Sequence, residues 1–243
     1  MSAFSDALIE RTKQFSREVE AIAFTFDGYI YNPLNYAFAP HSIYLRRFVH
    51  QNVDVYFLGM NPGPFGMVQT GVPFGEVEAV TQWMGISSEV GHPPSEHPQR
   101  PVVGFAIKRS EISGKRLWSL MKDRYGTAEH FFQHHAVMNY CPLVFVDKGK
   151  TGRNIIPEKL AKGEKEELER ICNAYLDDTL TLIKPKALVG IGRYAQKQLS
   201  KAAQRLNLTQ EVFSILHPSP GSPLANAGWD TKVIAQMEEA SLW

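Results

Sequence analysis

The segment VDVYFLGMNPGPFG, residues 53–66, joins an apolar run to a loop rich in glycine and proline. Its first part, Val53–Leu58, is apolar almost without a break, as expected for a short strand covered on both faces of a sheet. Its second part, Gly59–Gly66, places three glycines and two prolines around one asparagine. Such a loop is either a plain structural turn or a site where backbone approaches a ligand closely, and its composition favours neither.

Three further apolar runs have the same character, at His135–Asn139, Ala187–Ile191 and Val212–Leu216. Helical patterns alternate with these runs and also occupy both ends of the chain, from Phe4 to about Ala23, and at Glu76–Gly85, Ser113–Tyr125, Pro157–Ile183, Arg193–Leu206 and Trp229–Ala240. Alternation of this kind is typical of parallel sheets. The sequence therefore predicts an α/β three-layer sandwich with a central four-stranded parallel sheet flanked by helices.

Bulk composition narrows the class of protein. At 243 residues with 44% hydrophobic side chains, the chain has enough apolar surface for one domain, which we expect to span residues 1–243. It has no apolar run long enough for a membrane span and no signal-peptide pattern at its beginning, so we expect an intracellular protein without membrane contact. Two cysteines, Cys141 and Cys172, are too few for a disulfide framework or an iron–sulfur cluster, and we expect both to be buried and inert.

The charge balance limits how the chain can bind nucleic acid. Lys and Arg number 26 against 25 Asp and Glu, so a polyanion can be attracted only by a local basic patch. No metal site is predicted, because the adjacent His134 and His135 have no Cys or His partner at ligand spacing.

Unusual residues follow each predicted strand. Because open parallel sheets bind ligands at the carboxyl ends of their strands, Asn61, Asn139 and His217 are expected to meet in one cleft. His217, ahead of a proline-rich turn, is either a hydrogen-bond donor to a ligand or a capping or core histidine. The Gly190–Gly192 pair lacks the third glycine of a dinucleotide-binding motif and is interpreted as the structural start of a helix.

Several motifs together resemble one enzyme family. They are GMNPGPFGMVQTGVPFGEV at 59–77, SEHPQRPVVG at 95–104, NYCPL at 139–143 and HPSP…NAGW at 217–229, with weaker matches at 31–41, 113–118 and 151–154. The chain resembles the single-strand-selective monofunctional uracil-DNA glycosylases, within the uracil-DNA glycosylase superfamily. The likeness covers most of the chain, and the first motif is highly specific.

The resemblance implies hydrolysis of the N-glycosidic bond of uracil and 5-oxidised uracils such as 5-hydroxymethyluracil in DNA, with no cofactor and no metal. It implies that Asn61 positions the hydrolytic water and that His217 stabilises the departing base at O2 of that base. It also implies that Asn139 reads the uracil edge and that Phe74 stacks on the base. We expect Met60 and Gly63 to contact the base as well, Gly63 either as a pocket wall or merely as a flexible turn residue.

The implied partner is DNA, single- or double-stranded, that contains uracil or an oxidised pyrimidine. We expect the chain to be a monomer and to be located in the compartment that holds the DNA. Base flipping needs a wedge, for which the segment from Pro218 to Trp229 is the candidate. We expect Pro218, Ser219, Pro220 and Gly221 to contact DNA. The chain departs from vertebrate members at Gly221, where they have Arg, which bears on duplex penetration and on holding the abasic product.

Two other functions compete with this interpretation. A sibling branch with mismatch-type uracil and thymine specificity shares an Asn-Pro-Gly first motif, but the GVPFG and HPSP context favours the first family. A non-catalytic binder of nucleic acid or free nucleotide is a hypothesis of a different class. The presence of both Asn61 and His217 argues against it.

Overall fold

A parallel four-stranded sheet lies at the centre of the computed structural model, which describes residues 3–243. Its strands run in the spatial order β3-β2-β6-β7. They are β2 (Val55–Gly59), β3 (His135–Asn139), β6 (Ala187–Ile191) and β7 (Val212–Ile215). β2, β3 and β6 are buried along their whole length, which is why they are apolar apart from His135 and Asn139 at the two ends of β3. The predicted fold class is confirmed, and the four predicted strands differ from the observed ones only at their ends.

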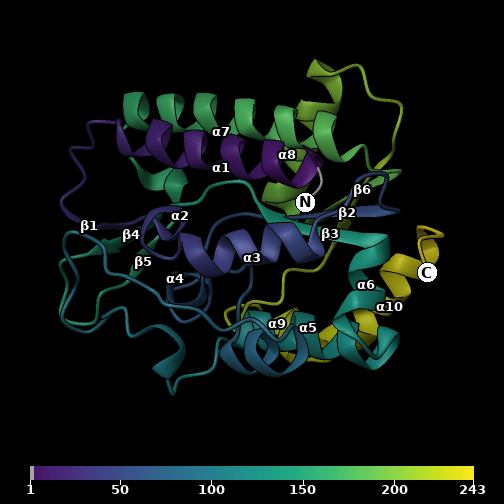
Figure 1. Cartoon of the computed structure of the whole chain (residues 1–243), viewed down its shortest axis with the longest axis horizontal. Helices are drawn as coiled ribbons and strands as arrows, with labels where there is room; N and C mark the ends of the chain where they lie inside the picture. Colours follow the sequence, from purple (N-terminus) through teal and green to yellow (C-terminus); the bar gives the residue numbers. More distant parts are fainter. Residues whose placement is uncertain (1–2) are drawn as a thin grey trace.

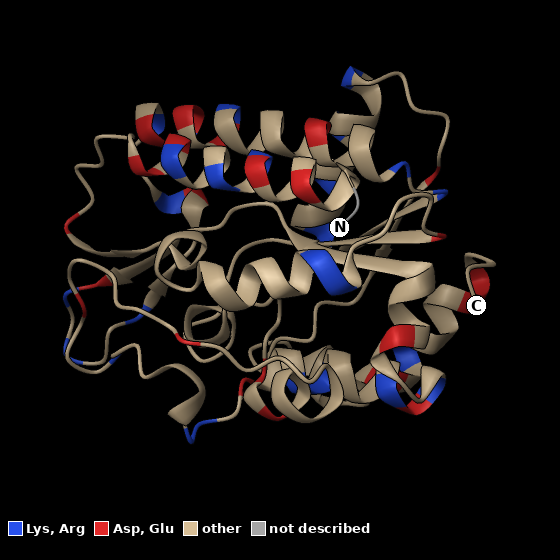
Figure 2. Cartoon of the chain, viewed as in Figure 1, with Lys and Arg blue, Asp and Glu red and all other residues tan. Residues whose placement is uncertain are grey.

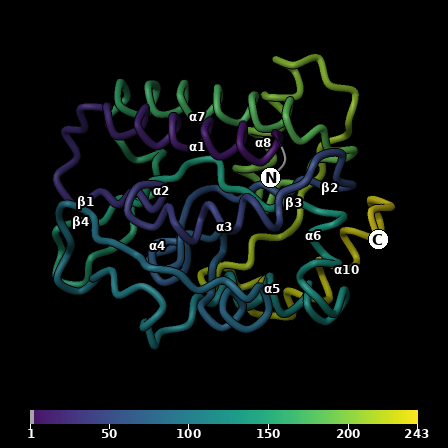
Figure 3. The backbone as a smooth tube through the Cα atoms, in the orientation of Figure 1, coloured from purple at the N-terminus to yellow at the C-terminus, as the bar shows by residue number. Residues whose placement is uncertain are grey.

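Helices cover both faces of this sheet (Figure 1). One face carries α1 (Ala3–Glu20), α7 (Lys162–Ile183) and α8 (Arg193–Arg205). The other carries α5 (Ile112–Tyr125), α6 (Ala128–His134) and α10 (Trp229–Glu239). Figure 3 shows the yellow C-terminal part of the chain in the same layer as α5, opposite α1 and α7. The result is the three-layer sandwich expected from the alternation of strands and helices.

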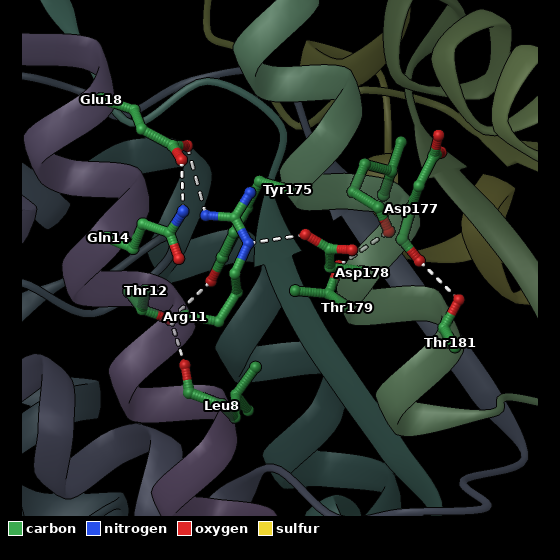
Figure 4. Close-up of polar contacts among 11 residues, drawn as sticks. Leu8, Arg11, Thr12, Gln14, Glu18, Tyr175, Asp177, Asp178, Thr179 and Thr181 are labelled. Carbon is green, nitrogen blue, oxygen red and sulfur yellow. Dashed lines mark hydrogen bonds and ion pairs between the residues drawn. The ribbon is translucent and has the colours of Figure 1, made fainter.

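The outer pair, α1 and α7, is joined by both packing and polar contacts (Figure 4). The rings of Phe15 and Tyr175 stack at 4.0 Å, and the Tyr175 hydroxyl shares a hydrogen bond of 2.8 Å with Thr12. Arg11 adds an ion pair of 2.6 Å with Asp178. These contacts fasten the first helix of the chain to α7, so the N-terminal segment is part of this helical layer.

The strand order contains a topological switch point. The chain passes from β2 to β3 on one side, then returns to place β6 on the other side of β2. Loops that follow β2 and β6 therefore diverge and leave a crevice at the carboxyl ends of the strands. This crevice is where the sequence places its unusual residues.

A second, smaller sheet lies beside the crevice and was not predicted. It is antiparallel, with the order β1-β4-β5, and consists of β1 (Gly28–Tyr31), β4 (Val144–Asp147) and β5 (Asn154–Ile155). It packs on a separate small core that includes Tyr31, Val68 and Val102. Strands of two to four residues give too short a pattern for recognition from sequence.

Two helix predictions were wrong in extent. The segment predicted as a helix at Glu76–Gly85 is helical only from residue 77 to residue 83, mostly as the π-helix η1 at Ala79–Trp83, and Gly85 follows it with a φ of +61°. The predicted helix Pro157–Ile183 is divided into the 3₁₀ turn η3 (Pro157–Lys159) and α7, because Leu160 and Ala161 have extended backbone. The remaining helices are α3 (Phe38–Phe48) and the short elements α2 (Pro33–Tyr36), α4 (Met67–Thr70), η2 (Gly104–Ala106) and α9 (Pro223–Asn226).

Neither cysteine takes part in a disulfide. Cys141 and Cys172 are both free and buried, and the burial agrees with the sequence expectation. Within residues 3–243, no helix combines the length and the hydropathy needed to cross a membrane.

Candidate active site

A cavity of about 300 Å³ opens at the carboxyl ends of the parallel strands. The loops after β2 and β7 contribute to its lining, and so does the last residue of β3. Six residues predicted to act on the base or the bond line this one cavity: Met60, Asn61, Gly63, Phe74, Asn139 and His217. Ser219, expected to contact DNA, lines it too. The predicted convergence of Asn61, Asn139 and His217 is therefore confirmed, whereas the roles assigned to them are not tested by geometry alone.

Asn61 lies in the loop after β2, where a hydrogen bond from its side-chain amide fixes its orientation. Its Nδ2 donates a hydrogen bond of 3.3 Å to the carbonyl of Leu143. The backbone pairing between β2 and β3 also continues past the strands, since the N–H of Cys141 donates to the carbonyl of Met60 at 2.9 Å. With the amide nitrogen used in this way, the Asn61 side chain offers its oxygen to the cavity as a hydrogen-bond acceptor.

Asn139 ends β3 and carries an unpaired acceptor. The side chain is 9% exposed, its Oδ1 makes no hydrogen bond within residues 3–243, and its Nδ2 reaches only the thioether of Met67 at 3.3 Å. Thioether sulfur is a weak acceptor, so both ends of the amide remain available to a ligand. Leaving such a group buried and unpaired costs about 1–3 kcal/mol, which a correctly shaped polar ligand recovers.

Gly59 brings the amide of Asn139 and the ring of Phe74 together. A Cβ at Gly59 would collide with the Asn139 Oδ1 and would lie 2.7 Å from the Phe74 ring. Such an approach is far below van der Waals contact, so only glycine permits this arrangement. The glycine-rich composition of the first motif therefore has a steric reason at this position.

Phe74 has a backbone conformation that residues with a side chain seldom adopt, with a φ of +51°. Two donors hold its carbonyl, the indole N–H of Trp118 at 2.9 Å and the backbone N–H of Glu76 at 2.7 Å. A left-handed conformation of this kind costs about 1–3 kcal/mol and persists where neighbours enforce it. The enforced turn places a partly buried aromatic face on the cavity.

His217 follows β7 and lies opposite that aromatic face, with the two ring centroids 6.4 Å apart. The backbone N–H of Ser219 donates to its Nδ1 at 3.1 Å. Burial lowers the pKa of His217 below its usual value, which favours the neutral ring. Gly192 makes room for it, because a Cβ there would lie 3.1 Å from the Cβ of His217. Gly192 is also the residue that precedes α8, as expected for a helix start, with a φ of +90°.

The loop after His217 is fastened to α5 by Arg116, a residue that sequence reasoning missed. Its guanidinium donates to the carbonyl of Pro218 at 2.9 Å and to the side-chain oxygen of Asn226 at 2.8 Å. Pro218 is buried, while Pro220 and Gly221 are exposed beyond the cavity. Of the four residues expected to contact DNA, Ser219 therefore lines the cavity, Pro220 and Gly221 lie on the surface, and Pro218 is buried.

Glu111 is a second residue of the cavity that had no predicted role. Its carboxylate caps α5 and accepts hydrogen bonds from the backbone N–H groups of Ser113, at 3.1 Å, and Gly114. Burial raises the pKa of Glu111. Its only signal in the sequence is its place two residues before the SGKRLW stretch. Ser113, Asn154 and Ile156 also line the cavity without having been assigned a role.

A larger hollow of about 760 Å³ lies between the end of α1, α2 and residues 92–94. Its polar side chains already have partners: Asn32 binds Ser16, Asn35 binds Glu20 and His92 binds Glu96. Within residues 3–243, no three His, Cys, Asp or Glu side chains gather as a metal site would require. The smaller cavity, by contrast, contains the unpaired Oδ1 of Asn139, and we place the chemistry there.

Comparisons with known proteins identify the family of the chain. The model of the uracil DNA glycosylase superfamily matches residues 47–235. The chain is 41% identical to the single-strand selective monofunctional uracil-DNA glycosylase of Rattus norvegicus, over 99% of this chain and 86% of the relative. Identity to the Bos taurus protein of the same description is 39%, over 99% and 88%. The crystal structure of wild-type Pedobacter heparinus SMUG2 superposes with a TM-score of 0.69 at 19% identity, covering 99% of this chain and 98% of that one, and this likeness bears on the fold alone.

Proposed function

Because the chain belongs to the uracil DNA glycosylase superfamily, we propose that its cavity removes uracil from DNA by hydrolysing the bond between the base and its deoxyribose. The relatives are named single-strand selective, and we extend that description to this chain. The proposal includes activity on double-stranded DNA and on 5-oxidised uracils such as 5-hydroxymethyluracil. The product is an abasic site in an uncut strand.

The observation that carries the proposal is the amide of Asn139, whose Oδ1 is unpaired, in a cavity that an aromatic ring and a histidine also line. A uracil edge presents a carbonyl oxygen and an N–H side by side, which match the donor and acceptor of one amide. Cytosine presents the opposite pattern and leaves the amide unsatisfied. A flipped base is bound in this way by stacking and by hydrogen bonds to its edge, so Phe74 and Asn139 form the base-binding walls.

The chemistry needs charge stabilisation more than a strong base. The glycosidic bond breaks toward a cationic sugar and an anionic uracil, so a donor aimed at the base oxygen lowers the barrier. Since Nδ1 of His217 accepts from Ser219, the neutral ring carries its proton on Nε2, the atom left to donate to O2. One such donor is worth about 2.7–4 kcal/mol in a preorganised site. Asn61 then holds the attacking water through its free amide oxygen.

Features outside the cavity support opening of the DNA stack. The helix α9 follows the His217 loop and exposes 62% of Leu224, one of few large apolar side chains so exposed among the described residues. An apolar side chain at this place suits insertion between bases. Arg116 donates hydrogen bonds to the carbonyls of Pro218 and Ser219, and these bonds hold the loop in place during insertion.

The lining of the cavity supports a monofunctional reaction. It contains no lysine among the described residues, and so offers no amine for a Schiff base with the sugar aldehyde. Treatment with borohydride during turnover should therefore trap no covalent protein–DNA adduct. Efficient trapping would overturn this part of the proposal.

The test of the proposed function is release of free uracil from a single-stranded oligonucleotide in buffer that contains EDTA. The expected result is one free uracil for each abasic site formed, in a strand that breaks only on later treatment with alkali. A protein that shifts the oligonucleotide but releases nothing is a binder, and this result would refute the proposal. Thymine release from a G·T mismatch at a rate comparable to uracil release would favour the sibling branch.

A further inference from the structure

Two arginines lie over the ring of Phe65, directly beside the cavity. The Cζ atom of Arg100 is 5.0 Å from the ring centroid and that of Arg109 is 4.0 Å from it. Phe65 follows Pro64, which lines the cavity. Contacts of guanidinium groups with an aromatic face contribute about 0.5–1 kcal/mol at exposed sites and limit the orientations that the planar groups adopt.

This arrangement is fixed to the cavity rim by a buried amide. Gln69 is 1% exposed, and its Nε2 donates to the carbonyls of Pro64 and Pro101, each at 3.1 Å. Its Oε1 accepts the backbone N–H of Val103 at 2.8 Å. The segment that carries Arg100 is therefore held against the loop that carries Phe65, and this geometry does not depend on a ligand.

Neither arginine is neutralised within residues 3–243, since neither has a carboxylate within 4.0 Å. The carboxylates nearby in sequence are engaged elsewhere: Glu96 binds His92 and the Val102 N–H, and Glu111 caps α5. Arg100 donates through Nε to the carbonyl of Gly152, at 2.9 Å, and through Nη1 to the carbonyl of Gln99, at 3.1 Å, so its Nη2 is the nitrogen left without a protein acceptor among the described residues.

Lysines add to the positive charge of this rim. Lys108 and Lys150 are exposed and have no ion pair among the described residues. Figure 2 shows several blue segments along the loops at the lower left, where residues near 108 and near 150 lie, with a few red segments among them. The chain as a whole has a net charge of only +1, so this rim is a local cationic surface.

We propose that the Phe65-supported guanidinium groups of Arg100 and Arg109 bind backbone phosphates of the DNA strand whose base enters the cavity. Preoriented guanidinium groups that have no carboxylate partner suit phosphate oxygens, to which they donate charge-assisted hydrogen bonds. Contacts of this kind set register without reading sequence. This inference rests on the proposed function, because it takes DNA as the substrate.

The test measures the dissociation constant for a single-stranded oligonucleotide containing 2′-fluoro-deoxyuridine, which resists excision, at several salt concentrations. Arg109→Gln should raise Kd and flatten the plot of log Kd against log salt by about 0.7, the value for one lost phosphate contact on single strands. Arg100→Gln should do the same, and the double variant should lose about twice as much slope. Arg109→Lys keeps the charge and should keep most of the slope.

The matched control is Lys201→Gln, which removes an exposed charge from α8 on the opposite face of the sheet and should leave Kd and slope as in wild type. Arg109→Gln should weaken binding of an undamaged oligonucleotide to the same degree as binding of the uracil analogue, since phosphates are common to both. An unchanged slope in both arginine variants would overturn the inference.

The two proposals can fail separately. If wild type releases uracil but the arginine variants bind DNA as wild type does, only the phosphate contacts are wrong. If wild type binds DNA with the expected salt dependence but releases no base, the proposed reaction is wrong and the phosphate contacts stand. Melting temperatures close to wild type in each variant, expected for exposed Arg109 in particular, exclude misfolding as the cause of weaker binding.

Discussion

The backbone N–H of Ser219 donates a hydrogen bond of 3.1 Å to Nδ1 of His217. This bond occupies the acceptor nitrogen of the neutral imidazole and leaves Nε2–H for a ligand. Burial lowers the pKa of His217, so the neutral form with this tautomer persists to lower pH than in free histidine. A turn of three residues therefore sets both the protonation and the direction of the donor.

The first prediction concerns this donor. His217→Leu should lower the single-turnover rate of uracil excision by about 10²–10³-fold, the usual cost of one oxyanion donor. Excision of 5-fluorouracil, a better leaving group, should fall less, because its anion needs less stabilisation. Rates are measured on matched single-stranded oligonucleotides. Equal losses for both bases would mean that His217 acts only through structure.

The second prediction concerns Gly63. Its φ lies outside the left-handed region, and a Cβ there would meet Glu111 atoms at 3.5 Å, an ordinary contact. Gly63→Ala should therefore leave the melting temperature unchanged and reduce excision of 5-hydroxymethyluracil more than that of uracil. Gly63→Tyr should fill the cavity and abolish both. Parallel losses accompanied by a lower melting temperature would instead indicate that Gly63 serves only the backbone.

The third prediction concerns stability in acid. Burial lowers the pKa of His41 and of His135 to about 4, and it also lowers the pKa of His217. Below about pH 6.5 these histidines become protonated in the unfolded chain but stay neutral in the folded one. Their contribution to the free energy of unfolding is therefore fully present above pH 6.5 and is lost as the pH decreases toward 4. Each group contributes up to about 1.4 kcal/mol per pH unit in that window. Urea unfolding between pH 4 and 7 measures the slope, and His135→Phe should reduce it.

The fourth prediction concerns Gly221, which is exposed and whose Cβ would meet only the Ser219 hydroxyl at 3.5 Å. Gly221→Arg should fit without strain and add a phosphate contact next to the proposed wedge. Duplex and abasic-site binding should tighten, with a salt slope steeper by about 0.9. Titrations at several salt concentrations provide the measurement. If the slope stays at the wild-type value, Gly221 lies away from the DNA.

Much of this architecture could be predicted from local sequence. The strand at His135–Asn139 is apolar because neighbours cover both of its faces, and parallel topology then forces the residues after each strand to one edge. The antiparallel sheet could not be predicted, since β5 has two residues and β1 pairs with β4, which lies far away in the chain. Pairing between segments distant in sequence leaves little local pattern.

The candidate site was predictable where a residue type itself carries chemistry, as with Asn61 and His217. Arg116 and Glu111 act through contacts that only the fold creates, one with the loop at Pro218 and the other with the start of α5. The same holds for Phe65, whose two arginine neighbours lie 35 and 44 residues further along the chain. Long-range contacts of this kind have no periodicity in sequence.

The central claim, that the amide of Asn61 positions the attacking water in a cavity that has already bound the base, is tested most directly by Asn61→Ala. We predict that single-turnover release of uracil falls by about 10²–10⁴-fold, while the Kd for the 2′-fluoro analogue and the melting temperature stay near wild-type values. The hydrogen bond to Leu143 is the only side-chain bond lost among the described residues, so folding should persist. Near-normal release by this variant would contradict the account.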